Sequence, residues 1–139
     1  MKLRTLLLLA VTLVIAGCGH GSGGIDTLSW SAHNPCLANP GGDTDKNHPV
    51  VCVDYDTLAP SFDPVTAAPG ATVKFYYTTQ KGKLRIEFPA NLKITHGASE
   101  GDDNDNGDVD PSQGRDHGKY SIVDKKTGRR NDPEILIEP

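Results

Sequence analysis

The sequence lacks most of the features that assign a chain to a familiar class of enzyme or binding protein. It contains no Gly-x-Ser-x-Gly elbow, no His-Glu-x-x-His pair and no phosphate-binding glycine loop. Its longest apolar run, 6–15, is too short to span a bilayer, which requires about 20 residues. The chain is acidic overall, with a formal net charge of −4, and no basic patch is evident in the sequence. Nucleic acid is therefore not expected as a partner, because phosphate contacts need clustered lysine and arginine.

The composition is also poor in apolar residues. Hydrophobic residues make up 36% of the chain, whereas it contains 15 glycines and 10 prolines. This balance predicts many turns and a small core, for which a covalent cross-link would be a useful stabiliser.

The N-terminal residues have the three-part organisation of a secretory signal. Lys2 and Arg4 precede the apolar run 6–15, and the small residues Ala16 and Gly17 follow it. The stretch 13–18, Leu-Val-Ile-Ala-Gly-Cys, resembles the lipobox of bacterial lipoproteins. The resemblance implies that 1–17 is a signal peptide that is removed, and that Cys18 becomes the lipid-carrying first residue of the mature protein.

A lipobox also implies a location for the remainder of the chain. The residue after Cys18 is Gly19 rather than aspartate, a choice that in Gram-negative lipoproteins is associated with export to the outer membrane. We expect a protein of the cell envelope, anchored in the outer membrane and facing the periplasm. Residues 18–25 are rich in glycine and predict a flexible tether, and 26–139 suit a single domain.

The three cysteines can be divided on the same basis. If Cys18 carries lipid, Cys36 and Cys52 remain. We expect them to form a disulfide, because the envelope outside the cytoplasm is oxidising. A loop of about 15 residues closed in this way contributes about 3 kcal/mol in the chain-entropy model. The alternative is a pair of free, buried thiols.

The rest of the chain reads as short strands separated by turns. Alternation is clearest at Val73, Phe75 and Tyr77, and Pro69-Gly70 before them predicts a type II turn. The segments that we expect to contain strands are 25–32, 50–55, 64–66, 72–77, 84–88, 92–95, 119–124 and 132–139. This pattern predicts an all-β fold, a single small β-sandwich.

Two phrases in this pattern carry a resemblance to a fold. Residues 63–75 and the closing phrase Asp-Pro-x-Ile-x-Ile at 132–137 resemble strands of immunoglobulin-like or cupredoxin-like sandwiches. A blue-copper site requires two histidines, a cysteine thiolate and usually a methionine. The single methionine is the initiator and no cysteine lies near the C-terminal strands, so copper is not expected.

Calcium is the metal that the sequence favours. The segment 97–118 lacks apolar periodicity and predicts a long acidic loop. Within it, 102–110 resembles the first nine positions of an EF-hand loop, with Gly107 at the sharp turn. Gln113 replaces the final glutamate and Pro111 opposes an exiting helix, so a weak calcium site and a solvated acidic loop both remain open. The predicted ligands are Asp102, Asn104, Asn106, Asp108 and Asp110.

Catalysis has one set of candidates. His96 and His117 flank the acidic segment, and Asp116 lies beside His117. An envelope enzyme built around these three residues is the alternative to our main expectation. That expectation is a lipid-anchored, non-enzymatic binding or structural module, whose partners are the membrane, through Cys18, and an unidentified envelope protein or ligand.

Overall fold

The computed structural model describes residues 33–79 and 81–139. The expected signal peptide (1–17), the lipid-bearing Cys18, the tether (18–25) and the strand expected within 25–32 lie outside the described residues. The described part of the chain is an all-β sandwich, as the sequence predicted. The only helix that lies wholly within these described residues is a short 3-10 helix, η1 (Pro35–Leu37).

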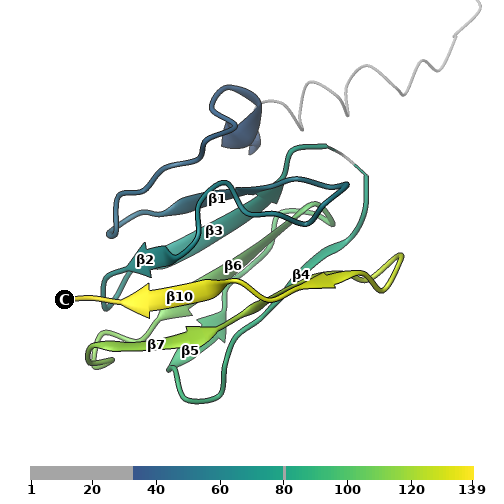
Figure 1. Cartoon of the computed structure of the whole chain (residues 1–139). Helices are drawn as coiled ribbons and strands as arrows, with labels where there is room; N and C mark the ends of the chain where they lie inside the picture. Colours follow the sequence, from purple (N-terminus) through teal and green to yellow (C-terminus); the bar gives the residue numbers. More distant parts are fainter. Residues whose placement is uncertain (1–32, 80) are drawn as a thin grey trace, which may run out of the picture.

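One layer of the sandwich is a four-stranded sheet. Its strands are β1 (Val50–Val53), β3 (Thr72–Tyr77), β6 (Asn104–Val109) and β5 (Ile94–His96), in the order β1-β3-β6-β5. β1 runs parallel to β3, and the other two pairs are antiparallel. Because β5 has a neighbour only on the β6 side, it forms one edge of this sheet (Figure 1).

The other layer is built on a long hairpin near the C-terminus. Its first arm contains β7 (Asp116–Lys119) and β8 (Ser121–Asp124), and its second arm contains β9 (Arg130–Asn131) and β10 (Glu134–Ile137). A hydrogen bond from the Tyr120 N–H to the Pro133 carbonyl, 3.0 Å long, connects the two ladders. The arms therefore behave as one antiparallel pair along their whole length.

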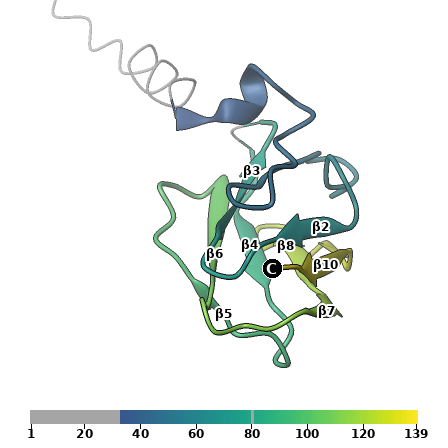
Figure 2. The same ribbon diagram turned by 90° about the vertical axis from the view of Figure 1, so that its left-hand side faces the viewer.

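Two short strands complete this layer. β2 (Val65–Ala67) lies parallel to β10 at one end of the hairpin, and β4 (Leu84–Glu87) lies antiparallel to β8 at the other. Seen from the side, β3, β5 and β6 lie on one side of the molecule and β7 and β10 on the other (Figure 2).

The core fills the space between the two layers. Val73, Phe75 and Tyr77, the alternating residues of β3, are completely buried. The ring of Phe75 lies 5.4 Å from that of Tyr120 in the hairpin, so side chains of the two layers meet directly. Burial of each such side chain contributes about 1.5–3 kcal/mol, which makes this alternation the main determinant of how the sheet faces the hairpin.

The start of the described chain is fixed to the sandwich by a disulfide. Cys36 in η1 and Cys52 in β1 are bonded, with their Cα atoms 5.6 Å apart. Asn34 caps η1 by accepting from the Cys36 N–H, and its amide donates to the Tyr77 carbonyl (2.8 Å). The predicted disulfide is confirmed, and this segment is attached to the end of β3.

One prediction about the chain path is wrong. The segment 97–118 is not one long acidic loop, because it contains β6 and the beginning of β7. β6 is an internal strand with β3 on one side and β5 on the other. Most of its polar side-chain atoms find partners within the protein, whereas Asn106 Oδ1 is buried without a hydrogen bond.

Candidate functional site

The residues predicted to bind calcium lie mainly along β6. Asn104, Asn106 and Asp108 occupy alternate positions of this strand. Alternate residues of a strand stand roughly 7 Å apart, whereas a calcium loop curls its oxygens around one ion at about 2.4 Å. The straight backbone therefore separates oxygen atoms that an EF-hand loop would gather.

These side chains interact with protein groups. The recorded contacts are Asn104 Oδ1 with the Glu100 N–H (2.8 Å), Asn106 Nδ2 with the Ala98 carbonyl (2.6 Å), Asp108 Oδ1 with the Thr72 hydroxyl (2.6 Å), Asp110 Oδ1 with the Ser112 N–H (2.7 Å), and Asp102 Oδ1 with the Lys83 ammonium (3.4 Å). Across residues 33–79 and 81–139, no three His, Cys, Asp or Glu side chains are grouped so that they could hold a metal ion. The structure gives the predicted calcium site no support.

Asp105, between the predicted ligands, is the acid around which β4, β5 and β6 are organised. It is only 3% exposed. Its carboxylate accepts hydrogen bonds from the backbone N–H groups of Ile86 (2.7 Å) and Asn106 (2.9 Å). Arg85 Nη1 lies 3.8 Å and His96 Nδ1 3.6 Å from its oxygens. The sequence analysis did not single out this residue, because it read the acidic run as a loop.

His96, Asp116 and His117 come from different parts of the sandwich. His96 is on the edge strand β5, where its ring lies 5.5 Å from that of Phe88 and its Nδ1 faces Asp105. Asp116 and His117 are consecutive residues of β7, in the other layer, and the Asp116 carboxylate accepts from the His117 N–H. The contacts recorded for His96 thus connect it to Asp105 and Phe88.

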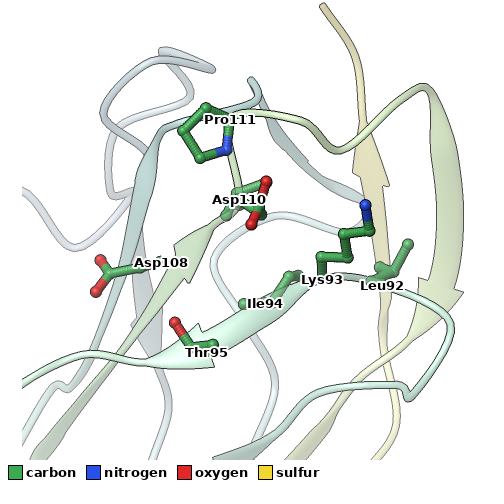
Figure 3. Close-up of a pocket in the computed structure, with 8 residues that line it drawn as sticks. Leu92, Lys93, Ile94, Thr95, Asp108, Asp110 and Pro111 are labelled. Atoms are coloured by element: carbon green, nitrogen blue, oxygen red, sulfur yellow. The ribbon is translucent and has the colours of Figure 1, made fainter.

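A surface groove lies along the paired segments of β5 and the end of β6, where Ile94 pairs with Val109 and Thr95 with Asp108 (Figure 3). Its volume is about 310 Å³. Apolar side chains of Leu92, Ile94 and Val109 contribute to the groove, and Lys93, Asp108 and Asp110 add charges of both signs. Thr95 and Pro111 complete the lining. A groove with both apolar and charged lining residues suits a small ligand or a protruding side chain of a partner.

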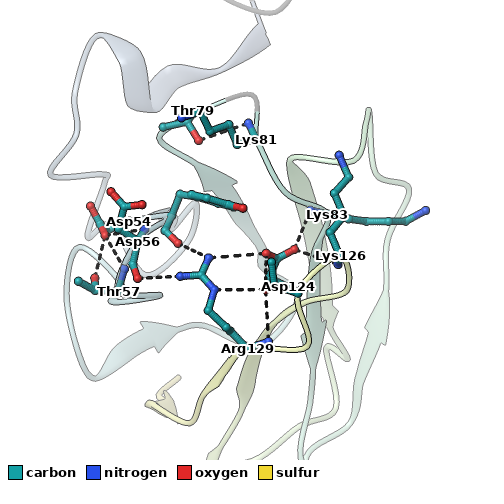
Figure 4. A network of polar contacts seen from close by, with 11 residues as sticks. Asp54, Asp56, Thr57, Thr79, Lys81, Lys83, Asp124, Lys126 and Arg129 are labelled. Carbon is teal, nitrogen blue, oxygen red and sulfur yellow. Dashed lines mark hydrogen bonds and ion pairs between the residues drawn. The ribbon is translucent and has the colours of Figure 1, made fainter.

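The last residue of β8, Asp124, carries a second carboxylate, which is completely buried (Figure 4). It accepts from the backbone N–H groups of Lys83 and Lys126, both at 3.1 Å, and from the Thr127 hydroxyl at 2.7 Å. Arg129 Nη2 lies 3.6 Å away. Burial raises the pKa of Asp124, but these hydrogen bonds and the arginine charge outweigh burial and hold the pKa below its usual value.

Arg129 extends this network to the first layer. Its guanidinium donates to the carbonyls of Tyr55 (2.6 Å) and Asp56 (2.7 Å) and lies 4.8 Å from the centre of the Tyr55 ring. The network therefore holds the hairpin turn against the loop after β1. These contacts could not be read from the sequence, because they join segments more than 70 residues apart.

Comparison with models of known protein families gave no match, and comparison with curated proteins gave none either.

The two buried carboxylates share one chemical character. Asp105 and Asp124 each accept backbone N–H groups, Asp105 from Ile86 in β4 and Asp124 from Lys83 just before β4, and each faces an arginine. Such arrangements join strands and stabilise the charged form of the acid.

The part of the chain that the structure describes contains no helix with the length and hydropathy that a membrane span requires.

Proposed function

We propose that this protein is a lipid-anchored lipoprotein of the cell envelope, whose β-sandwich acts as a non-enzymatic binding or structural module. The observation that carries the proposal is the order of residues 2–18: a positive start, a short apolar run, two small residues and Cys18. Gly19 after the cysteine favours the outer membrane of a Gram-negative bacterium, facing the periplasm.

The disulfide supports an address outside the cytoplasm. Cys36 and Cys52 are each 2% exposed and bonded to one another. Bonds of this kind persist in the periplasm and other oxidising compartments, and are rare where glutathione keeps thiols reduced. The leader and the disulfide are different features of the chain, and both favour a location outside the cytoplasm.

The internal contacts of the charged residues support a binding or structural role. Asp105 and Asp124 hold strands together, and Arg129 joins a turn to a neighbouring loop. The surface groove that includes Ile94 and Val109 is the feature that we assign to the binding of a ligand or an envelope partner.

The anchor is tested by changing Cys18 to serine in the full chain. We expect wild type to fractionate with membranes and its N-terminal peptide to show the mass of a lipid-modified cysteine. Cys18→Ser should lose both properties, because the hydroxyl cannot form the thioether. The matched control is Ser22→Ala, four residues away, which should change neither. Recovery of Cys18→Ser in membranes with its leader cleaved at the same place, or an unmodified Cys18 in wild type, overturns the proposal.

A second variant tests the membrane to which the protein is sorted. Gly19→Asp places aspartate after the lipidated cysteine, the choice that family resemblance associates with retention in the inner membrane. We expect the variant to keep its lipid and to move to the inner-membrane fraction. Unchanged sorting would contradict the assignment to the outer membrane while leaving lipidation intact.

A further inference from the structure

Two turns that are about 40 residues apart in the sequence meet at one end of the sandwich. The Lys83 N–H donates to the Asp124 carboxylate (3.1 Å), and the Lys125 N–H donates to the Lys83 carbonyl (2.9 Å). Four exposed lysines are thereby placed on neighbouring backbone: Lys81 and Lys83 before β4, and Lys125 and Lys126 after β8 (Figure 4). We call these four residues the lysine end. Lys125 and Lys126 are neighbours in the sequence, and the fold brings Lys81 and Lys83 to them.

Two acids, Asp102 and Asp103, adjoin the lysine end, because their carbonyls accept from the N–H groups of Leu84 (2.6 Å) and Tyr77 (2.7 Å), but the four lysines outnumber them. Lys83 lies 3.4 Å from Asp102, but both side chains are more than half exposed, so this pair is weak. The nearest buried acid, Asp124, is occupied by hydrogen bonds and Arg129. Lys125 and Lys126 use their backbone N–H groups in the turn, which leaves their ammonium groups facing solvent.

The described chain also begins at this end. Asn34 donates to the carbonyl of Tyr77, the last residue of β3, and Lys81 and Lys83 follow Tyr77 closely in the sequence. Fourteen residues lie between Cys18 and His33. At no more than about 3.5 Å per residue they span at most about 50 Å, so a lipid on Cys18 keeps this end close to a bilayer.

We propose that the lysine end is a docking surface for the anionic phospholipid headgroups of the membrane that holds the anchor; this inference rests on the proposed lipidation of Cys18. Each lysine near an anionic membrane surface raises the association constant for that membrane by about fivefold. The chain has a formal charge of −4, and loss of Lys2 and Arg4 with the leader leaves −6 on the part from Cys18 onward. An anionic bilayer therefore attracts the lysine end and repels the remainder, which orients the domain.

This orientation has a consequence for the groove. Asp108, which lines it, pairs with Thr72, the first residue of β3, whereas the lysine end adjoins Tyr77, the last residue. Docking by the lysines therefore turns the groove away from the bilayer, where a partner can reach it.

The inference is tested by measuring how fast each lysine of the lipidated full chain reacts with an amine-acylating reagent. The protein is placed in vesicles of phosphatidylcholine, alone or with a third of phosphatidylglycerol, and acylation is followed by peptide mass spectrometry. We expect Lys81, Lys125 and Lys126 to react at least about threefold more slowly with phosphatidylglycerol present, and about 1 M salt to remove the protection. Lys46 and Lys119, elsewhere on the domain, serve as internal references with unchanged rates.

A matched pair of variants separates the lysine end from general charge. Lys125→Gln with Lys126→Gln should abolish the protection of Lys81, whereas Lys74→Gln with Lys119→Gln should retain it. All four positions are exposed, so both variants should fold.

Equal rates in the two vesicles, or equal protection of Lys46 and Lys119, overturn the docking surface while leaving the anchor standing. An N-terminal peptide without lipid overturns the proposed function itself.

Discussion

At the scale of single residues, Gly107 shows how a polar strand fits into the sandwich. It lies in the middle of β6, and a Cβ atom at this position would overlap the ring of Phe88. That ring packs against the core through Phe75, with ring centres 6.2 Å apart. The glycine that the sequence analysis assigned to a sharp calcium-loop turn is required here because an aromatic ring lies against the strand.

Gly107→Ala should therefore destabilise the protein by about 1–3 kcal/mol, the usual cost of overpacking. The measurement is urea denaturation of the full chain. Gly114→Ala is the matched control, since a Cβ there meets no atom within 4 Å and its backbone has no positive φ. Equal midpoints for Gly107→Ala and wild type would show that Phe88 moves aside without cost.

At the scale of elements, the β8–β9 turn depends on the ionised form of Asp124. Its pKa is lower in the folded protein than the ordinary value of about 3.9. On acidification the unfolded chain takes up the proton first, so this stabilisation is present above about pH 4 and is lost as the pH falls through the folded pKa. Asp45, Asp54, Asp110 and Asp132, whose pKa values are also lowered, add to the same trend.

Asp124→Asn should lower the free energy of unfolding by about 1–3 kcal/mol at pH 7, because charged hydrogen bonds are replaced by neutral ones. The difference from wild type should shrink as the pH falls from 5 towards 2. Denaturant titrations at several pH values measure it. A constant difference across this range would show that ionisation of Asp124 does not stabilise the turn.

Strand β6 provides a test of the calcium hypothesis. Its candidate oxygens are spread along a strand and already accept from Glu100, Thr72 and Ser112. Millimolar calcium should therefore leave the melting temperature of the full chain unchanged, because only a ligand bound selectively by the folded state raises it. A rise that Asp108→Ala removes, and that Asp116→Ala does not, would restore the calcium site.

The strands that could be predicted from the sequence are those in which apolar and polar residues alternate because every second side chain is buried. Val73, Phe75 and Tyr77 identify β3, and Gly70 has the positive φ, 83°, that a type II turn requires. β6 could not be predicted, because its sequence, Asn-Asp-Asn-Gly-Asp-Val, has little strand propensity and few apolar residues. It forms because partners distant in sequence satisfy it, including Ile86 and Thr72.

At the scale of the whole molecule, the same limit applies to the candidate site. The pairing of Cys36 with Cys52 was predictable from the count of cysteines and the leader. The grouping of Lys83 with Lys125, of Asp105 with His96, and of Arg129 with Tyr55 was not, since each depends on how distant segments meet. The alternation of apolar and polar residues along short segments was therefore enough to predict the class of fold. The grouping of side chains on the surface depends on contacts between segments that are distant in the sequence.

The disulfide decides how firmly η1 is attached to the sandwich. Cys36 and Cys52 are separated by 16 residues and lie in a small cluster with Tyr76, apart from the main core. Replacing both cysteines by alanine should lower the free energy of unfolding by about 3 kcal/mol, the amount expected for a loop of this length. It should also raise hydrogen exchange at the N–H groups of η1, with less effect on β10.

Urea denaturation and peptide-resolved exchange measure these effects. Wild type treated with a reductant should match the double variant, and alkylation without reductant should find neither cysteine free. Two alkylated cysteines in the folded wild type would show that the bond is absent in solution. Unchanged exchange in η1 would show that the hydrogen bond from Asn34 to Tyr77 holds the segment without it.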